Sequence, residues 1–99
     1  MPAGLGSKKI APKGAQTKNP PGMKMPLASA FGHTVRLMRE KEGWTQEAFA
    51  DHCGFFRTYL SRIETGKANP TLNAIEVISL AVNLPISELI AMVERRQVS

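Results

Sequence analysis

The chain has 99 residues, of which 42% are hydrophobic and 21% charged, and its formal net charge is +5. This length suits a single domain and excludes an enzyme that needs a large cofactor domain, while the single cysteine excludes an intramolecular disulfide and fits a reducing compartment. No apolar run approaches the roughly 20 residues that a membrane span needs, and no apolar segment typical of a secretory signal follows the first lysines. We therefore expect a cytoplasmic protein that does not associate with membranes.

Residues 1–26 carry the whole charge excess. They hold five lysines and no acidic residue, whereas residues 27–99 hold eight basic and eight acidic residues. Five of the seven prolines interrupt this segment, and its few apolar residues show no helical or strand period. Because it cannot bury enough apolar surface to offset the entropy of ordering, we expect a disordered basic tail. The tail is either a solvated extension or an arm that contacts DNA phosphates.

From residue 27 to residue 99 the apolar pattern is helical and predicts a compact all-α domain. Thr45 and Thr71 are good helix N-caps, and Asn83 can take a left-handed C-cap conformation. Trp44 precedes the Thr45 cap and can pack on Phe49 as a hydrophobic staple. The five helices are expected at about residues 28–41, 46–53, 56–65, 72–82 and 86–94, the last beginning at Pro85 or Ile86.

The predicted inner faces follow the helical period of these segments. In chain order the side chains expected in the core are Phe31, Val35, Met38, Leu60, Ile63, Leu72, Ile75, Ile78, Val82, Leu89 and Val93.

Two short helices meet at Gly54, with Ala50 four residues earlier and Leu60 six residues later. A helix-turn-helix needs a small residue where its helices approach and a glycine that adopts positive φ at the turn. It also needs an apolar residue that locks the second helix onto the first. All three stand at the required spacing, so residues 46–63 predict a helix-turn-helix.

A longer stretch, residues 35–89, resembles the Cro/C1-type phage-repressor family, also called the XRE helix-turn-helix family. Residues 57–61 are in addition similar to restriction–modification controller proteins. The resemblance implies a five-helix, lambda-repressor-like DNA-binding domain. It further implies a homodimer on a palindromic operator, with the third helix in the major groove. The segments that carry it are Arg36–Arg39, Gly43–Gln46, Arg57–Glu64, Gly66-Lys67, Asn69-Pro70 and Pro85–Leu89.

The face of the third predicted helix opposite Leu60 and Ile63 carries arginine, threonine and serine but no acid. An ordinary solvated face usually mixes acids with bases, whereas arginine bonds guanine edges and threonine or serine bonds base edges or touches a thymine methyl. The resemblance implies that Arg57 and Arg62 read bases and that Gln46 and Lys67 contact DNA phosphates. Lys67 is equally consistent with an ordinary surface residue. The candidate DNA-binding residues are Gln46, Arg57, Thr58, Tyr59, Ser61, Arg62, Thr65 and Lys67.

Two residues near this face need an explanation of their own. Glu64 would repel phosphate if it were free, and the resemblance pairs it with Arg39 as a structural ion pair, which is costly to break from one side. Phe56 stands where the family usually has Ser, Thr or Asp as the cap of the third helix, a loss of about 1 kcal/mol. Phe56 either covers the edge of the core or contacts a DNA sugar or a protein partner.

No catalytic constellation, phosphate loop or cofactor motif is present in the sequence, so we expect neither an enzyme nor a bound cofactor. His52 and Cys53 supply too few ligands for a metal ion, and we interpret Cys53 as a small core residue.

The leading hypothesis is a sequence-specific transcriptional regulator that binds double-stranded DNA without a small-molecule effector. We expect it to dimerise through the fourth and fifth helices, with Val77, Leu80 and Ile90 forming the seam. One alternative is an antitoxin or another protein-binding module that uses the same fold. A second alternative is a nonspecific nucleic-acid binder whose affinity depends on residues 1–26.

Overall fold

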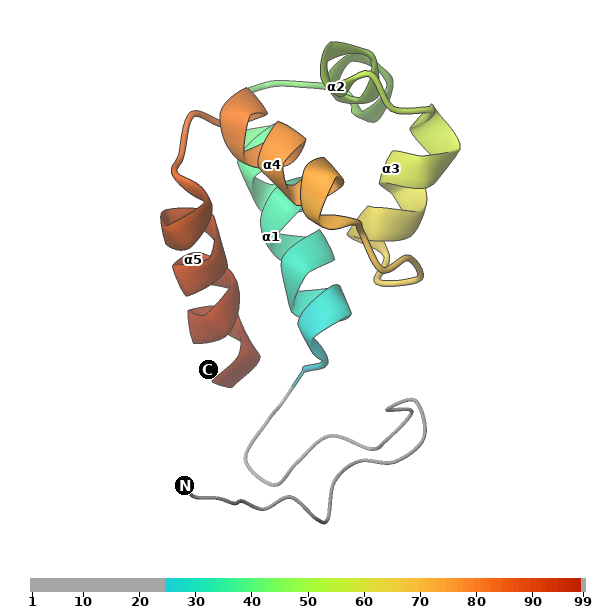
Figure 1. The fold of residues 1–99 in the computed structure, drawn as a ribbon. Coiled ribbons are helices and arrows are strands. Elements are labelled where there is room, and N and C mark those ends of the chain that lie inside the picture. The colour runs from blue at the N-terminus through green and yellow to red at the C-terminus, as the bar shows by residue number, and fades with distance from the viewer. Residues whose placement is uncertain (1–24, 99) are drawn as a thin grey trace.

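The computed structural model describes residues 25–98, and five helices and no strand occur within that range. In Figure 1, α3 and α5 lie on opposite sides of α1, α2 packs against α3 and α4, and α4 packs against α5. The predicted five-helix all-α fold is thus confirmed. The helices are α1 (Leu27–Lys41), α2 (Gln46–Cys53), α3 (Arg57–Glu64), α4 (Leu72–Ala81) and α5 (Ile86–Val98).

Side chains and turn residues fix the ends of α2 and α4 as predicted. The Thr45 hydroxyl accepts a hydrogen bond from the Ala48 amide at 3.1 Å, which caps α2. Thr71 caps α4 in the same way, 3.0 Å from the Ala74 amide. Beyond α4, Asn83 has φ 58°, the left-handed conformation expected of it.

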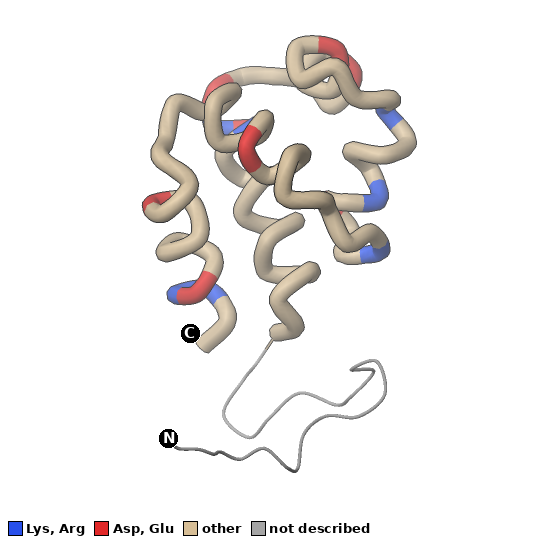
Figure 2. The backbone as a smooth tube through the Cα atoms, in the orientation of Figure 1, with Lys and Arg blue, Asp and Glu red and all other residues tan. Residues whose placement is uncertain are grey.

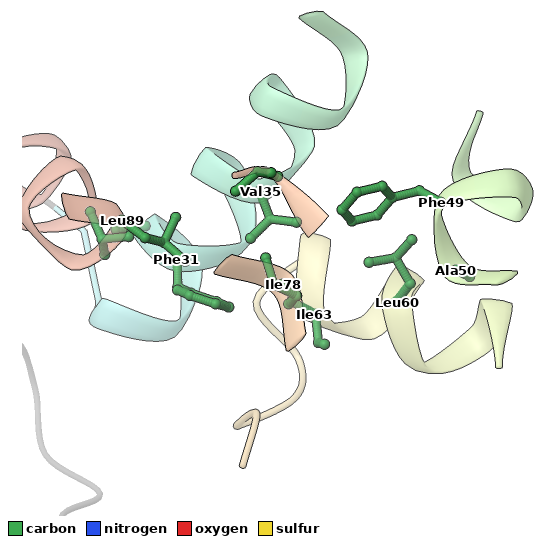
Figure 3. Packing of buried hydrophobic residues seen from close by; sticks show 11 residues of the cluster. Phe31, Val35, Phe49, Ala50, Leu60, Ile63, Ile78 and Leu89 are labelled. Carbon is green, nitrogen blue, oxygen red and sulfur yellow. The ribbon is translucent and has the colours of Figure 1, made fainter. Parts of the chain in front are cut away.

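The core lies where all five helices meet, and Figure 3 shows the side chains that fill it. The Trp44 ring packs edge-on against Phe49, with 5.9 Å between ring centroids, so the predicted staple is present. Burial of these apolar side chains is the main source of stability of the domain. The largest fully buried side chains are Phe49, Leu60, Ile63, Ile78, Leu89, Val35, Val93 and Thr34.

The predicted inner face of α4 is wrong at its first residue. Leu72 is 83% exposed, whereas Ala74 and Ile78 are buried. Successive helical residues turn by about 100°, so residue 72 lies about 200° around the helix from residue 74 and faces solvent. Ile75, between the two faces, is half-buried.

Helix ends also differ from the prediction. α3 is shorter by one residue at each end, because Phe56 and Thr65 are its caps. α5 continues to Val98 rather than ending at about residue 94. The buried side chain at position 97, four residues after Val93, is the polar Gln97, so the apolar pattern stops one turn before the helix does. Arg96 Nε also donates to Thr34 Oγ1 of α1 at 3.0 Å, which holds this last turn in place.

Most of the predicted tail, residues 1–24, lies outside the described residues. Met25 and Pro26, which the prediction assigned to the tail, belong with the folded part. Met25 packs against the core, and its carbonyl accepts a hydrogen bond from Gln97 Nε2 at 3.5 Å.

Within residues 25–98, no single helix is long and apolar enough to cross a membrane. α4 and α5 reach the required length and composition only as a pair, which is bent by 99° at the break between them. The apolar residues Ile78, Leu89 and Val93 of this pair are buried in the core.

Candidate nucleic-acid interface

α2, the turn at Gly54 and α3 have the geometry of a helix-turn-helix. Gly54 has φ 78°, a conformation that glycine adopts without steric penalty. The amide of the next residue, Phe55, donates to the Ala50 carbonyl at 2.8 Å and closes the turn. Ala50 is 1% exposed at the approach of the two helices, and Leu60 is fully buried. The roles predicted for Ala50, Gly54 and Leu60 are all confirmed.

The two faces of α3 differ sharply in character. Leu60 and Ile63 are fully buried on one side. The basic positions of α3 and of the loop after it follow the outer edge of the molecule, as Figure 2 shows, while acidic positions lie on α2, α4 and α5. Of the predicted DNA-binding residues, Arg57, Thr58, Arg62, Thr65 and Lys67 are exposed, and Gln46, Tyr59 and Ser61 are half-buried.

The two arginines of this face are held differently. Arg57, in the first turn of α3, has no hydrogen-bond or ion-pair partner among residues 25–98. Arg62 Nη2 donates to the Lys67 carbonyl at 3.0 Å, so its guanidinium lies over the turn that follows α3. This bond uses one of the five N–H donors of a guanidinium and restricts the rotamers of the side chain.

Two other predicted residues have contacts within the domain. The Tyr59 ring packs edge-on against Phe55, with 5.1 Å between centroids, which anchors the turn. The Thr65 hydroxyl donates to the Ser61 carbonyl at 2.9 Å. This carbonyl also accepts the Thr65 amide at 3.1 Å, so the hydroxyl adds a second bond to it and keeps its oxygen as an acceptor.

Arg39 and Glu64 join α1 to α3 through two hydrogen bonds. Arg39 Nε lies 2.7 Å from Glu64 Oε2, and Arg39 Nη2 donates to Glu64 Oε1 at 3.0 Å. The two side chains are 9% and 2% exposed. The hydrogen bond with Glu64 raises the pKa of Arg39, so the guanidinium stays protonated. Arg39 Nη1 also donates to the Trp44 carbonyl at 2.8 Å, which ties the α1–α2 connection to the pair.

Gln46 is drawn into the same network. Its Nε2 donates to Glu64 Oε1 at 3.0 Å, so one N–H of the predicted phosphate ligand already has a partner inside the domain. The carboxylate of Glu64 thereby links α1, α2 and α3 at one point. This network fixes the orientation of α3 relative to the first residue of α2.

Phe56 does not cover the edge of the core, and that interpretation of its role is wrong. The side chain is 84% exposed and makes no hydrogen bond that caps α3. The adjacent Phe55 is half-buried against the core instead. The other interpretation of Phe56, a contact with DNA or with a partner, stays open.

The sequence reasoning missed Gly32. An ideal Cβ at this position would lie 1.9 Å from the Ile63 carbonyl oxygen, because α1 and α3 approach each other backbone to backbone here. The available signal was a glycine in the interior of an amphipathic helix, where alanine would give a more stable helix.

Cys53 is half-buried and packs against the core, and burial raises the pKa of its thiol to about 11. No group of three or more His, Cys, Asp or Glu residues within the described range is arranged to hold a metal ion.

Residues 30–89 match the family model described as "Helix-turn-helix domain". The chain belongs to the helix-turn-helix family. Its relatives include a hypothetical transcription factor of Neisseria meningitidis, 33% identical over 71% of this chain and 66% of that protein. The control protein C.MunI of a Mycoplasma species is 39% identical over 66% of this chain and 89% of that protein.

Two solved structures of restriction–modification controller proteins are also similar. C.AhdI from Aeromonas hydrophila has a TM-score of 0.60 and 31% identity, over 63% of this chain and 94% of that chain. The C.Esp1396I tetramer in complex with its natural 35 base-pair operator has a TM-score of 0.68 and 25% identity, over 77% of this chain and all of that chain. The resemblance to XRE regulators and controller proteins is therefore confirmed.

This helix-turn-helix domain also exposes apolar surface on α4 and α5. Leu80 is 70% exposed and Ile86 43%, while Val77 is half-buried between the core and solvent. Half-buried Ile90 helps to line a hollow of about 210 Å³ where the start of α1 meets α4 and α5. Its other lining residues are Leu27, Ala28, Phe31, Asn69, Pro70 and Ile75.

Proposed function

We propose that this helix-turn-helix protein is a sequence-specific transcriptional regulator that binds a palindromic DNA operator as a homodimer, with α3 in the major groove. The observation that carries the proposal is the outer face of α3. Arg57, Thr58 and Arg62 are exposed there, on a helix whose other side is fixed by buried Leu60 and Ile63. The acid of this helix, Glu64, is buried and neutralised by Arg39, so it does not repel phosphate.

Each exposed side chain has a contact that suits its chemistry. Arg57 and Arg62 read guanine edges by bidentate hydrogen bonds, while Lys67 contacts phosphate as a point charge. Gln46 keeps one N–H and its carbonyl oxygen for the DNA backbone, because an amide has two donors. Thr58, Tyr59, Ser61 and Thr65 contact base edges or phosphates along the same face.

The comparisons support the regulatory part of the proposal. The four proteins described above are named as a hypothetical transcription factor, a control protein and two controller proteins. One of them, C.Esp1396I, forms a tetramer in complex with its operator. Regulation of transcription through an operator is the role that we extend to this chain.

The homodimer rests on the apolar surface of α4 and α5. Val77 and Leu80 lie close together around α4, three residues apart on the helix, and Ile90 of α5 adds to the same kind of surface. In a two-fold dimer this surface packs against its own copy, so it must be self-complementary. Two symmetry-related copies of α3 that lie about 34 Å apart enter successive turns of the major groove.

Selection of bound sequences from random duplex DNA at physiological salt tests the proposal. We expect one enriched inverted repeat whose half-site centres lie about one helical turn apart. If no sequence is enriched, the regulator proposal fails, and a protein-binding module such as an antitoxin becomes the better explanation. If the chain binds DNA without enriching any sequence, and that affinity vanishes when residues 1–24 are deleted, the protein is a nonspecific binder that depends on its basic segment.

A further inference from the structure

Phe56 combines high exposure with a position at the start of α3. It is the N-cap residue of this helix, with φ −71° and ψ 145°, and 84% of its surface is exposed. The preceding residue, Phe55, turns the other way and packs against Tyr59. The turn therefore directs one aromatic ring into the domain and the other into solvent, next to Arg57.

Stability does not account for an aromatic residue at this position. A Ser, Thr or Asp would accept a hydrogen bond from the first turn of α3 and contribute about 1 kcal/mol, which phenylalanine cannot do. With so much of its surface exposed, the ring also gains little from burial within the domain. A partner that buries the ring on binding would supply the apolar burial that the ring lacks in the free domain.

The position of Phe56 selects duplex DNA as that partner. The first residues of a recognition helix are those that contact base edges in the major groove, and Phe56 directly precedes Arg57 at that end of α3. The apolar group that a base edge presents in this groove is the 5-methyl group of thymine, and phenylalanine is one of the side chains that contact it.

We propose that Phe56 packs on a thymine methyl group in each half-site and so selects thymine at that position of the operator. The inference rests on the proposed function. It adds an apolar contact, which selects a base without a hydrogen bond, to the polar contacts that α3 makes. It also explains why an apolar residue replaces the polar cap: the ring is buried only in the complex.

Replacement of thymidine by deoxyuridine tests this contact, because it removes the methyl group and leaves the hydrogen-bonding edge intact. The probe is the duplex recovered by selection, with each thymidine replaced in turn at symmetric positions in both half-sites. For the unmodified protein we expect at least one position at which affinity falls by about fourfold per methyl group, and the position that Phe56 contacts is the one whose penalty disappears in Phe56→Ser. Fluorescence anisotropy titrations at constant salt measure the loss.

Phe56→Ser is the informative variant, since serine restores a capping side chain and should leave the domain folded, which circular dichroism checks. It should melt at the same or a higher temperature, bind the thymidine operator more weakly, and bind thymidine and deoxyuridine duplexes equally. Leu72→Ala is the matched control, because Leu72 is 83% exposed at the start of α4. This variant should keep the full penalty for deoxyuridine.

The outcomes separate this inference from the proposed function. If Arg57→Ala relaxes base preference while Phe56→Ser keeps the penalty for deoxyuridine, the regulator stands and the thymine contact is wrong. The contact is also wrong if Phe56→Ser binds the operator as tightly as the unmodified protein. If no sequence is selected at all, the proposed function fails and this inference fails with it.

Discussion

Gly32 of α1 and Ile63 of α3 meet backbone to backbone: a Cβ on Gly32 would lie 1.9 Å from the Ile63 carbonyl oxygen and 2.9 Å from its carbonyl carbon. Both residues are buried. No side chain separates the two helices at this point, so the position of α3 is set directly by α1. Because α3 carries the candidate DNA face, Gly32 controls the placement of that face without touching it.

Gly32→Ala should destabilise the domain by about 1–3 kcal/mol or more, because the added methyl group has no space and α3 must move away. Intrinsic helix propensity acts in the opposite direction, since alanine in a helix interior is about 1 kcal/mol better than glycine. The sign of the change in the free energy of unfolding therefore shows whether the steric clash or the helix propensity is the larger effect. Chemical denaturation followed by circular dichroism measures it.

The control for this variant is His33→Ala, which changes an exposed neighbour on the same helix. It should alter the free energy of unfolding by no more than about 0.5 kcal/mol. A Gly32→Ala protein that is more stable than the unmodified one would show that α1 and α3 do not approach as closely as described.

The Arg39–Glu64 pair should behave as a coupled unit. Truncating either residue alone leaves a buried charge without its partner and should cost about 3–5 kcal/mol, whereas replacing both with leucine should recover much of the loss. Truncation of Arg39 should cost slightly less stability than the burial of Glu64 alone implies, because Gln46 still donates a hydrogen bond to the Glu64 carboxylate. Unfolding free energies of the two single variants and the double variant form a double-mutant cycle. Strictly additive effects would mean that the two side chains do not stabilise each other.

Local signals in the sequence predicted most of the fold, because the features concerned depend on residues close together in the chain. The Trp44–Phe49 staple, the Thr45 cap and the turn at Gly54 each involve residues within five positions of one another. Leu72 was misplaced because the helical phase of α4 is set by contacts with other helices. The end of α5 was missed because the side chain that continues its buried face is Gln97.

The candidate site was less accessible to sequence reasoning. The exposed basic face of α3 followed from its periodicity, but the inward hydrogen bond of Gln46 to Glu64 joins residues 18 positions apart in the chain. The bond from Arg62 to the Lys67 carbonyl depends on how the chain turns after α3. Such contacts arise from the tertiary arrangement, and composition and spacing carry no direct trace of them.

The thiol of Cys53 should make stability pH-dependent above neutrality. Burial raises its pKa from 9.0 to about 11, so the folded state holds the proton more tightly than the unfolded state. The stabilisation is present below about pH 9 and is lost as the pH rises through about 11. Unfolding free energies at several pH values in this range, compared with those of Cys53→Ala, isolate the contribution. An identical pH profile for the two proteins would show that the thiol is as accessible as in the unfolded chain.

Leu80→Glu should weaken self-association without unfolding the domain, because Leu80 is 70% exposed and makes little contribution to the core. A buried like-charge pair across a two-fold axis disfavours the dimer. Analytical ultracentrifugation over a range of concentrations measures the change, with circular dichroism as the check on folding. Leu37→Glu, at an apolar residue of α1 that is 41% exposed, is the control and should leave association unchanged. Equal association of both variants would place the dimer seam elsewhere.

Arg62→Ala and Lys67→Ala should separate base reading from phosphate contact. Loss of a bidentate contact with guanine costs about 1–3 kcal/mol on the selected operator and relaxes preference at one base pair in each half-site. The Lys67 variant should instead weaken binding to every sequence alike and flatten the slope of log affinity against log salt by about 0.9 per phosphate contact removed. The Arg62 side chain also bonds the Lys67 carbonyl, so its loss frees the turn that carries Lys67.

Titrations with the operator and with scrambled DNA at several salt concentrations measure both effects, after circular dichroism confirms folding. If Arg62→Ala lowers affinity for both DNAs equally, α3 does not read sequence through this side chain, because a base contact must distinguish the operator from scrambled DNA.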